Sequence, residues 1–591
     1  MDIKRTLRSL LAILLLFAPL FATLPRAVSA EQPAAAKAPG ERSIVLDKQY
    51  LLFPVGTSTG KDSHMTITVD GEKIHDLYID LGLDKVEWWT HIDVTQWAGK
   101  TATLTINNPE KTAAGFERIE TSDEPRNLHP LYNERLRPQL RFSQQRGWSN
   151  DVEGLIYYDG EYHFFWLGNP FAWTVKNRYW GHAVSKDLIH WQQLPYALRP
   201  RAMGNFHVFS KGHCFSGSGN VDVKNTGGWQ KGDEKVMVLA YTDTARGECI
   251  AISRDRGRTW EPIPENPVIK HKGRDPKLIW YAYDAGDTPL DDRAKQLGGH
   301  WVIVVFDEEP EHGRNFAFYT STDLKQWTLQ SRLKDYFECP ELFELPVDGD
   351  PDNTRWVLYD VRANYAVGDF DGRKFTPEHD GRRQVHWPRF VASSCLKRAP
   401  DGRVIQIAWA HRIDMHNMPF NQAFTLPGKL WLINTPDGVR MRHWPIKEID
   451  TLREEPLNAE PATVSQDKPL AIAVDGQLFD ILADVDVMDA ERIVLQFGQT
   501  KVVYDVAGQN LDTMALPLEN GKLRMRCIVD RPMYELWGGD GEVHRSNYRS
   551  DGGKTIEDIR IYAEGGRAKV EKFIVYPMES IWKRWHSTQE D

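Results

Sequence analysis

The stretch of sequence that decides the fold reads GWSNDVEGLIYYDGEYHFFWLGNP over residues 147–170 and, after a short gap, YWGHAVSKDLIHWQQLPYAL over residues 179–198. Asp151 lies between a tryptophan-bearing turn and a short apolar strand, with aromatic residues on both sides. A carboxylate among aromatic rings is typical of sites that cleave sugars, because rings stack on sugar faces and the carboxylate attacks or stabilises the anomeric carbon. The alternative is a β-hairpin whose aromatic residues only fill a core.

A Ser-x-Asp…Trp pattern recurs at a fixed period through residues 141–442. It begins at Ser185, Ser253 and Ser321, so successive serines are 68 residues apart. A period of this length in a β-rich chain predicts propeller blades with insertions, and about 300 residues accommodate four to five of them. The Ser and Asp side chains are expected to cap a hairpin turn, which is a structural role and not a catalytic one.

The rest of the chain predicts two further β modules, so the fold class is all-β. Alternating strands and turns predict a small N-terminal β-sandwich over residues 41–120, followed by the propeller over residues 135–450. After a polar linker, another strand-rich stretch predicts a C-terminal β-sandwich over residues 465–585. Trp88 and Trp89 in the first module are expected to pack in its core; the alternative is that they face sugar.

Composition limits the partners and the compartment. The formal net charge is −10 and there is no long basic run, which argues against nucleic acid and anionic membranes as partners. Residues 1–30 combine a basic start, an apolar run and a small-x-small site at Ala27–Ala30, so they predict a cleaved signal peptide and a secreted or periplasmic protein. An uncleaved anchor is the alternative. A monomer is expected, with no membrane partner after cleavage.

The cysteines are few, odd in number and widely spaced, which argues against both a disulfide scaffold and a zinc site. Buried free thiols are expected at Cys214, Cys249, Cys339, Cys395 and Cys527.

Two further acids lie at blade-like distances from Asp151. Asp275 stands in a Gly-Arg-Asp-Pro segment before an apolar strand, and Glu338 stands in Glu-Cys-Pro-Glu before another. Asp275 lies 124 residues after Asp151, nearly two repeats, and Glu338 lies 63 residues after Asp275, nearly one repeat. Equivalent positions of a propeller return to one central channel. Retaining glycoside hydrolysis needs one carboxylate to attack and a second to protonate the leaving oxygen, and a third charged group can steady the transition state. The alternative is that these acids are solvated turn residues.

Several motifs together resemble those of glycoside hydrolase family 32, the invertases, inulinases and levanases, over roughly residues 138–582. The family's W-x-N-D-P-N-G, F-S-G-S, W-G-H-A, R-D-P and E-C-P motifs stand here as Trp148–Gly154, Phe215–Ser218, Trp180–Ala183, Arg274–Pro276 and Glu338–Pro340.

The resemblance implies a five-bladed β-propeller followed by a β-sandwich, and β-fructofuranosidase chemistry with retention and with no metal or cofactor. It implies Asp151 as nucleophile, Glu338 as acid/base and Asp275 as transition-state stabiliser. The substrate would be a fructan or another fructose-containing oligosaccharide. The N-terminal module is similar to an extra module of some secreted levanase-like members. Substrate contacts are expected from Trp148, Asn150, Glu153, Trp173, Trp180, Phe215, Ser216, Arg274, Cys339 and Trp409.

The chain departs from the family pattern around the nucleophile. Val152 and Glu153 replace the usual Pro and Asn, and Leu167 stands where a sugar-binding Gln is usual. The usual W-G-N is absent, and Trp173 is expected to substitute for its ring. Glu153 would raise the pKa of a neighbouring carboxylate, bind a different sugar hydroxyl, or pair with Arg178 or Lys176. These changes leave the exact substrate open.

Other functions remain open from the sequence. Another furanoside or a fructosyl acceptor would make the protein a different propeller glycosidase or a transferase. The Ser253–Trp260 segment also matches a sialidase-type turn, although that turn is structural. A propeller that only binds carbohydrate is a further alternative. A metal site at His207, His213 and Cys214 has looser spacing than known metal motifs, and loop histidines are expected instead.

Overall fold

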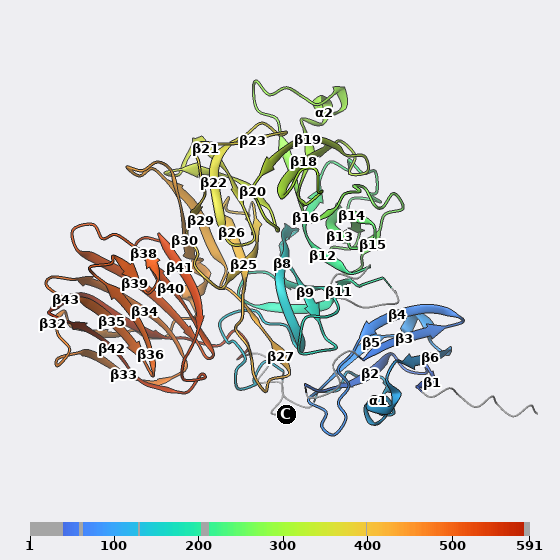
Figure 1. Ribbon diagram of the computed structural model, residues 1–591, viewed down its shortest axis with the longest axis horizontal. Helices are drawn as coiled ribbons and strands as arrows, with labels where there is room; N and C mark the ends of the chain where they lie inside the picture. Colours follow the sequence, from blue (N-terminus) through green and yellow to red (C-terminus); the bar gives the residue numbers. More distant parts are fainter. Residues whose placement is uncertain (1–39, 58–62, 128–130, 202–211, 398, 584–591) are drawn as a thin grey trace, which may run out of the picture. The chain divides into compact units, whose positions relative to one another are not determined.

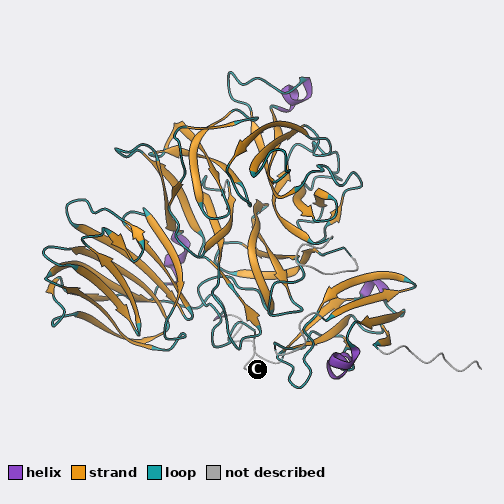
Figure 2. Ribbon diagram, viewed as in Figure 1, coloured by secondary structure: helices purple, strands orange, loops and turns teal. Residues whose placement is uncertain are grey.

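The structure, a computed structural model, describes residues 40–57, 63–127, 131–201, 212–397 and 399–583. The regular secondary structure of the described chain is almost entirely β-strand, as Figure 2 shows, which confirms the predicted fold class. The predicted signal peptide and His207 lie outside the described residues. No helix in the described ranges is both long and apolar enough to cross a membrane. All five cysteines are described, and all are free thiols, as expected. Four are buried, but Cys339 is partly exposed, so its predicted burial is wrong.

The central region is built from antiparallel sheets whose strands follow one another in sequence (Figure 1). The first sheet contains β8 (Gly147–Tyr158), β9 (Glu161–Asn169), β10 (Tyr179–Ser185) and β11 (Trp191–Leu198). The second contains β12 (Cys214–Asp222), β13 (Val236–Asp243), β14 (Gly247–Ser253) and β15 (Glu261–Pro262). The third contains β16 (Gly273–Ala282), β17 (Gly299–Asp307), β18 (Asn315–Ser321) and β19 (Thr328–Lys334).

A ten-stranded sheet completes this region. Its first half contains β20 (Glu341–Val347), β21 (Asp350–Tyr359), β22 (Asn364–Phe370), β23 (Phe375–Pro377) and β24 (Arg383–Gln384). Its second half contains β25 (Phe390–Leu396), β26 (Val404–Ala410), β28 (Ala423–Phe424), β29 (Gly428–Ile433) and β30 (Arg440–Pro445). The two halves are joined by one parallel pair, Val347 with Leu432.

The leading strands of these sets form a closed cycle. In turn, β8 contacts β12, β12 contacts β16, β16 contacts β20, β20 contacts β25, and β25 returns to β8. A short late strand, β27 (Phe420–Asn421), also pairs in parallel with the start of β8. The first sheet of the central region thus contacts its last strands. The leading strands therefore surround a common axis, with their N-terminal ends at the same end of it.

The Ser-x-Asp…Trp turns have the structural role predicted for them. The Ser185 hydroxyl accepts the Leu188 N–H at 2.9 Å, and the Asp187 carboxylate accepts two backbone N–H groups. The Trp191 indole then donates to the Leu188 carbonyl at 2.9 Å. The copies that begin at Ser253 and Ser321 repeat the Ser–Asp and Trp–backbone bonds.

Two sheets precede the central region. One contains β1 (Glu41–Val45), β6 (Thr101–Ile106), β3 (His64–Val69) and β4 (Glu72–Tyr78), and the other contains β5 (Trp88–Asp93), β2 (Tyr50–Val55) and β7 (Glu120–Ser122). The helical segments here are η1 (Thr95–Trp97) and α1 (Pro109–Phe116). The two sheets share one apolar core. Trp88 and Trp89 are buried, so the expectation that they pack inside is confirmed.

The C-terminal region is a β-sandwich of two sheets. One contains β31 (Leu457–Ala459), β32 (Ala462–Val464), β34 (Leu478–Asp486), β39 (Lys522–Asp530), β40 (Met533–Gly538), β41 (Val543–Tyr548) and β43 (Ala568–Pro577). The other contains β33 (Leu470–Gly476), β35 (Arg492–Phe497), β36 (Thr500–Asp505), β37 (Asn510–Leu511), β38 (Met514–Ala515) and β42 (Ile556–Glu564). Their inner faces form a continuous core. The remaining helical segments are α2 (Asp292–Leu297) and η2 (Lys447–Leu452).

Candidate active site

The three predicted acids lie at the same end of the cycle of leading strands. Asp151 is near the start of β8, Asp275 is near the start of β16, and Glu338 precedes β20 by three residues. Arg274 lies 3.9 Å from Asp275 and donates to Glu338, and the Cys339 N–H donates to Asp275, so these two acids share one site. After burial and Arg274, the charges of Glu338 and Asp151 also act on the pKa of Asp275, and both raise it. Residues far apart in the sequence therefore meet in one site.

Asp151 is half-buried and held by the neighbouring strand. Its Oδ2 accepts a hydrogen bond from the Ser216 hydroxyl of β12 at 3.1 Å. The register of β8 against β9 shifts on both sides of Val152, so Asp151 and Glu153 lie in a doubly bulged segment. Bulges re-aim side chains near active sites, and this one allows Asp151 to reach Ser216.

Asp275 is buried and held by backbone groups. It lies where the register of β16 shifts, and its φ of 66° is in the left-handed region. Its Oδ2 accepts the Cys339 N–H at 3.1 Å, and its own N–H donates to the Thr242 hydroxyl at 2.9 Å. Burial and two nearby carboxylates raise its pKa above the ordinary value although Arg274 opposes the shift. Asp275 therefore binds a proton more tightly than an ordinary aspartate does, whereas a charged third acid was predicted.

Glu338 is fixed by an arginine. Arg274 donates from Nε to Glu338 Oε1 at 3.0 Å and from Nη2 to the same oxygen, while its Nη1 donates to Glu308 at 3.0 Å. Glu338 and Cys339 have φ values of 52° and 44°. Two consecutive non-glycine residues in the left-handed region are strained, and such strain is concentrated at functional sites.

Glu153 does not match its predicted role as a sugar contact. Its side chain is fully buried, and its Oε2 accepts the Gly217 N–H at 2.8 Å. Neither a sugar nor Lys176 can be its partner in this conformation, since Lys176 pairs with Asp80 instead. The charge of Glu153 acts to raise the pKa of Arg178, against the larger effect of burial. The two side chains are therefore near each other, as predicted.

The predicted aromatic contacts fall into two groups. The rings of Trp148 and Trp409 are partly exposed and meet edge to face at 6.2 Å. Phe215 is also partly exposed and lies under the Arg178 guanidinium at 4.7 Å. Trp180 has no exposed surface and donates from its indole to the Phe215 carbonyl at 3.1 Å. Trp180 therefore supports Phe215 and does not itself meet a ligand in this conformation.

Polar partners fix the exposed members of this set. The Trp148 indole donates to Asn150 Oδ1 at 2.8 Å, which occupies that amide oxygen. The Trp409 indole donates to Gln422 Oε1 at 3.0 Å. The half-exposed Trp173 donates to the Met418 carbonyl at 3.1 Å.

The segment that carries Trp173 is held by the N-terminal sheets. Asn177 accepts the Tyr78 N–H at 2.9 Å and donates to the Tyr78 carbonyl at 2.8 Å. Lys176 pairs with Asp80 at 3.2 Å. The N-terminal module thus restrains a loop beside the acids.

Sequence reasoning missed three supporting residues: Thr242, Glu308 and Gln422. They contact the site residues Asp275, Arg274 and Trp409, respectively. No local sequence signal marks them, because their partners are far away in the chain.

A cavity of about 650 Å³ opens at the other end of the leading strands. It is lined by the far halves of these strands, including Tyr157, Trp280 and Leu345, and by Lys224 and Lys397. None of the three acids lines it. The cavity volume alone would therefore place the site at the wrong end of the leading strands. The three grouped carboxylates indicate the opposite end.

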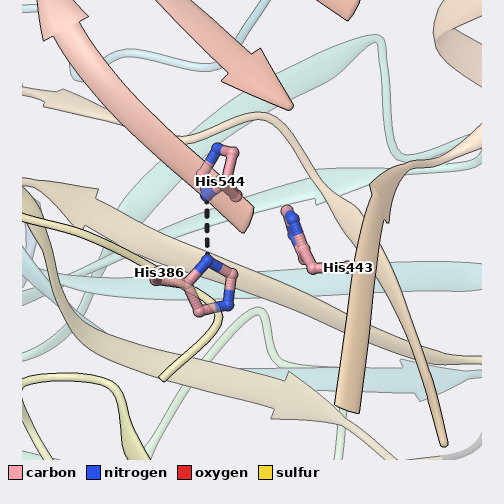
Figure 3. A group of neighbouring side chains, drawn as sticks. All are labelled: His386, His443 and His544. Atoms are coloured by element: carbon pink, nitrogen blue, oxygen red, sulfur yellow. Dashed lines mark hydrogen bonds between the residues drawn. The ribbon is translucent and has the colours of Figure 1, made fainter. Parts of the chain in front are cut away.

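Three buried histidines, His386, His443 and His544, gather between β25, β30 and β41 (Figure 3), with one nitrogen of each within 4.8 Å of the others. His386 and His544 share one hydrogen bond between their Nδ1 atoms at 2.9 Å. The Trp537 indole, which can only donate, occupies His443 Nδ1 at 3.0 Å. The outer nitrogen of His544 is bonded to Glu535.

Among the described residues, His443 Nε2 has no hydrogen-bond partner. Both ring nitrogens of His386 and of His544 already take part in hydrogen bonds, so a metal could bind all three histidines only by breaking some of those bonds. Of the metal site considered from sequence, His213 and Cys214 are buried, and burial lowers the pKa of His213 to about 4.

Comparison with known families decides the identity. The family described as "Glycosyl hydrolases family 32 N-terminal domain" matches residues 141–445, and "Glycosyl hydrolases family 32 C terminal" matches residues 448–577. The chain belongs to glycosyl hydrolase family 32. This family 32 protein is a glycoside hydrolase, which confirms the resemblance drawn from its motifs and argues against the sialidase and binding-only alternatives.

Named relatives of this family 32 enzyme agree with the assignment. It is 33% identical over 514 residues to the levanase of Bacillus subtilis (strain 168), covering 76% of this chain and 72% of the relative. It is 27% identical over 537 residues to the extracellular exo-inulinase of Aspergillus ficuum, covering 76% of this chain and 96% of the relative.

A solved structure shares the fold of this enzyme. The exo-inulinase of Aspergillus awamori superimposes with a TM-score of 0.65 at 24% identity, covering 76% of this chain and all of that one. A fructofuranosidase of Schwanniomyces occidentalis, solved with fructosylnystose, gives 0.64 at 23% identity.

Proposed function

We propose that this family 32 enzyme is a secreted or periplasmic β-fructosidase that cleaves β-fructofuranosidic bonds of fructans or related oligosaccharides with retention. The observation that carries the proposal is the meeting of Asp151, Asp275 and Glu338 at one end of the cycle of leading strands. The levanase and exo-inulinase relatives support a fructan as the substrate. The predicted signal peptide over residues 1–30 and the word "extracellular" in a relative's name support export.

The proposed reaction is a double displacement. Asp151 attacks the anomeric carbon while Glu338 gives its proton to the leaving oxygen, so the glycosidic bond breaks and an ester to Asp151 forms. Water then adds to the same carbon, gives a proton back to Glu338 and releases Asp151, which restores the enzyme. Asp275 holds sugar hydroxyls, and the positive charge that develops in the transition state favours its ionised form.

The surroundings of the acids support these roles. The Ser216 hydrogen bond keeps Asp151 in one orientation, which a nucleophile needs. Arg274 orients Glu338 and is itself held by Glu308. The partly exposed rings of Trp148, Trp409 and Phe215 would then pack against the sugar.

The proposal includes the finer architecture. The cycle of β8, β12, β16, β20 and β25 supports five blades, with the two halves of the ten-stranded sheet counted as separate blades. The domain limits 41–120, 135–450 and 465–585 remain predictions, as does the monomeric state. The absence of a required metal or cofactor is also part of the proposal.

Assaying the purified enzyme on levan, inulin, sucrose and raffinose tests this function. We expect free fructose of retained anomeric configuration, and a loss of at least a thousandfold in kcat for Asp151→Asn, in line with the effect of removing other enzymic nucleophiles. The exposed acid Glu311 supplies the control, because Glu311→Gln should leave kcat unchanged. Transfer of fructosyl groups to sugar acceptors would instead support a transferase. Unchanged turnover in Asp151→Asn would contradict the mechanism.

A further inference from the structure

Glu153 occupies an unusual position directly behind the proposed nucleophile. It lies two residues after Asp151 in the bulged segment of β8, and none of its surface is exposed. One carboxyl oxygen, Oε2, accepts the Gly217 N–H at 2.8 Å. Among the described residues, the buried Oε1 has no hydrogen-bond partner. A buried carboxylate normally has several donors, so this side chain needs an explanation.

Gly217 belongs to the part of β12 that presents Ser216 to the nucleophile. The register of β12 against β13 shifts between Phe215 and Gly217. Glu153 holds one side of this bulge through the Gly217 N–H, and Ser216 donates to Asp151 from the other side. Moving Gly217 would therefore move the hydroxyl that orients Asp151.

The hydroxyl of Ser216 has only one proton to give. The Ser216 hydroxyl donates to Asp151, and a hydrogen bond from the same hydroxyl also acts to lower the pKa of Glu153. It therefore lies next to both carboxyl groups. An ionised Glu153 can only accept hydrogen bonds and would compete with Asp151 for that proton. A protonated Glu153 can donate, and the competition disappears.

The charged surroundings of Glu153 favour its protonated form. Full burial, together with the charges of Asp151 on β8 and Asp275 on β16, raises its pKa well above the ordinary value. The Gly217 N–H and the Ser216 hydroxyl oppose this shift but are weaker. The other titratable groups that feel its charge are Arg178, Cys214 and Cys339.

We propose that Glu153 is a positioning residue that works as an uncharged carboxylic acid: it anchors the Phe215–Gly217 bulge and leaves the Ser216 proton to the nucleophile. The positioning role rests on the proposed function of Asp151. The uncharged state does not, because it follows from burial and from neighbouring carboxylates whatever the substrate is.

The first test is independent of catalysis. The unfolding free energy of the wild type and of Glu153→Gln is measured by urea titration from pH 4 to pH 8. Above about pH 4.5 the unfolded chain loses the Glu153 proton while the folded chain keeps it, so the wild type loses stability relative to Glu153→Gln as the pH rises. We expect the ratio of their unfolding constants to grow by up to about tenfold per pH unit and then to level off. A ratio that is constant across this range would overturn the proposal.

The second test separates charge from anchoring. Glu153→Gln keeps the size and the neutral state, so we expect its kcat to stay within about threefold of the wild type. At alkaline pH, its kcat should fall no more steeply than that of the wild type. Glu153→Ala removes the anchor and should lower kcat on the order of a hundredfold, with a smaller change in KM, because the nucleophile is misplaced. If Glu153→Gln is as inactive as Glu153→Ala, the uncharged acid is not the working form.

These outcomes distinguish the two proposals. A wild type that cuts no fructoside would contradict the proposed function, yet the unfolding series would still report the charge of Glu153. An active wild type with a pH-independent unfolding ratio would contradict only the proposal for Glu153.

Discussion

At the level of single residues, the candidate site depends on arginine geometry as much as on carboxylates. Arg274 contacts Glu338 through two nitrogens and Glu308 through a third. A guanidinium has a planar fork that can serve both partners at once, and a lysine ammonium does not. The orientation of the proposed acid/base thus depends on one side chain whose neighbour in sequence is another site residue, Asp275.

Replacing Arg274 with lysine should therefore disturb the reaction although the charge is kept. We expect Arg274→Lys to lower kcat on the order of a hundredfold, because Glu338 loses its fixed direction. Steady-state kinetics on the best fructoside measures this. Arg492, an exposed arginine of the C-terminal sandwich, is the matched control, and Arg492→Lys should be neutral. Full activity in Arg274→Lys would argue that Glu338 is oriented by other groups.

At the level of elements, irregularities at the starts of the leading strands create the site. The registers of β8, β12 and β16 all shift near their N-terminal ends, close to Asp151, Ser216 and Asp275. A regular strand sends alternate side chains to opposite faces. The bulges break this alternation, so polar side chains turn towards neighbouring strands while the rest of each strand stays in apolar packing.

Two serines of β12 have different roles: one contacts the proposed nucleophile, and the other supports the packing of the strand. Ser216 donates to Asp151, whereas the buried Ser218 donates to the Pro276 carbonyl and accepts the Leu278 N–H. We expect Ser216→Ala to lower kcat by about tenfold to a hundredfold, the value of a hydrogen bond to a charged group. Ser218→Ala should instead reduce the unfolding free energy by about 1–3 kcal/mol, because it leaves buried backbone groups unsatisfied. Parallel kinetics and urea unfolding measure both, and equal effects on kcat would contradict this division.

At the level of the whole molecule, buried charges join the central region to the C-terminal sandwich. Arg141 pairs with Asp530 at 2.8 Å and also with Glu535, and all three are fully buried. Glu535 in turn contacts His544. A buried charge is costly unless it is paired. The arginine of the central region and the two acids of the sandwich therefore neutralise one another across the boundary between the two regions.

The same burial predicts how stability changes with pH. Burial is the main cause that lowers the pKa of several histidines, to about 4 for His163 and about 3 for His75. Below about pH 6.5 the unfolded chain binds protons that the folded chain cannot, so the unfolding free energy falls as the pH drops from 6.5 towards 4. Each such histidine contributes up to about 1.4 kcal/mol per pH unit. The other buried histidines with a lowered pKa are His182, His213, His300, His386 and His443.

Urea unfolding at several pH values checks this prediction. Glu153 and Asp275, whose pKa values are raised, act in the opposite direction over part of this range, but the histidines outnumber them. His163→Gln should flatten the dependence relative to the wild type, because it removes one buried group that the unfolded chain can protonate. Stability that stays constant from pH 7 to pH 5 would contradict the prediction.

How much the sequence could predict depends on the range of the interactions. The strand-rich pattern and the Ser-x-Asp turns depend on neighbours in the chain, and both were predictable. The burial of Trp88 was also predicted, although its indole donates to the distant Pro170 carbonyl. The motifs around Asp151, Asp275 and Glu338 were predictable as candidates, because these residue types at this spacing match the family.

The sequence by itself determined that the chain is an all-β protein of family 32 with three candidate acids. Only the tertiary structure decided which neighbours act on them. Glu153 was expected to contact sugar, and instead it is sealed behind Asp151 against Gly217. Trp180 was expected at the surface of the site, and it supports Phe215 from below. The physical reason is that burial, like-charge repulsion and hydrogen-bond competition depend on distances between strands, and no local pattern of residues encodes those distances.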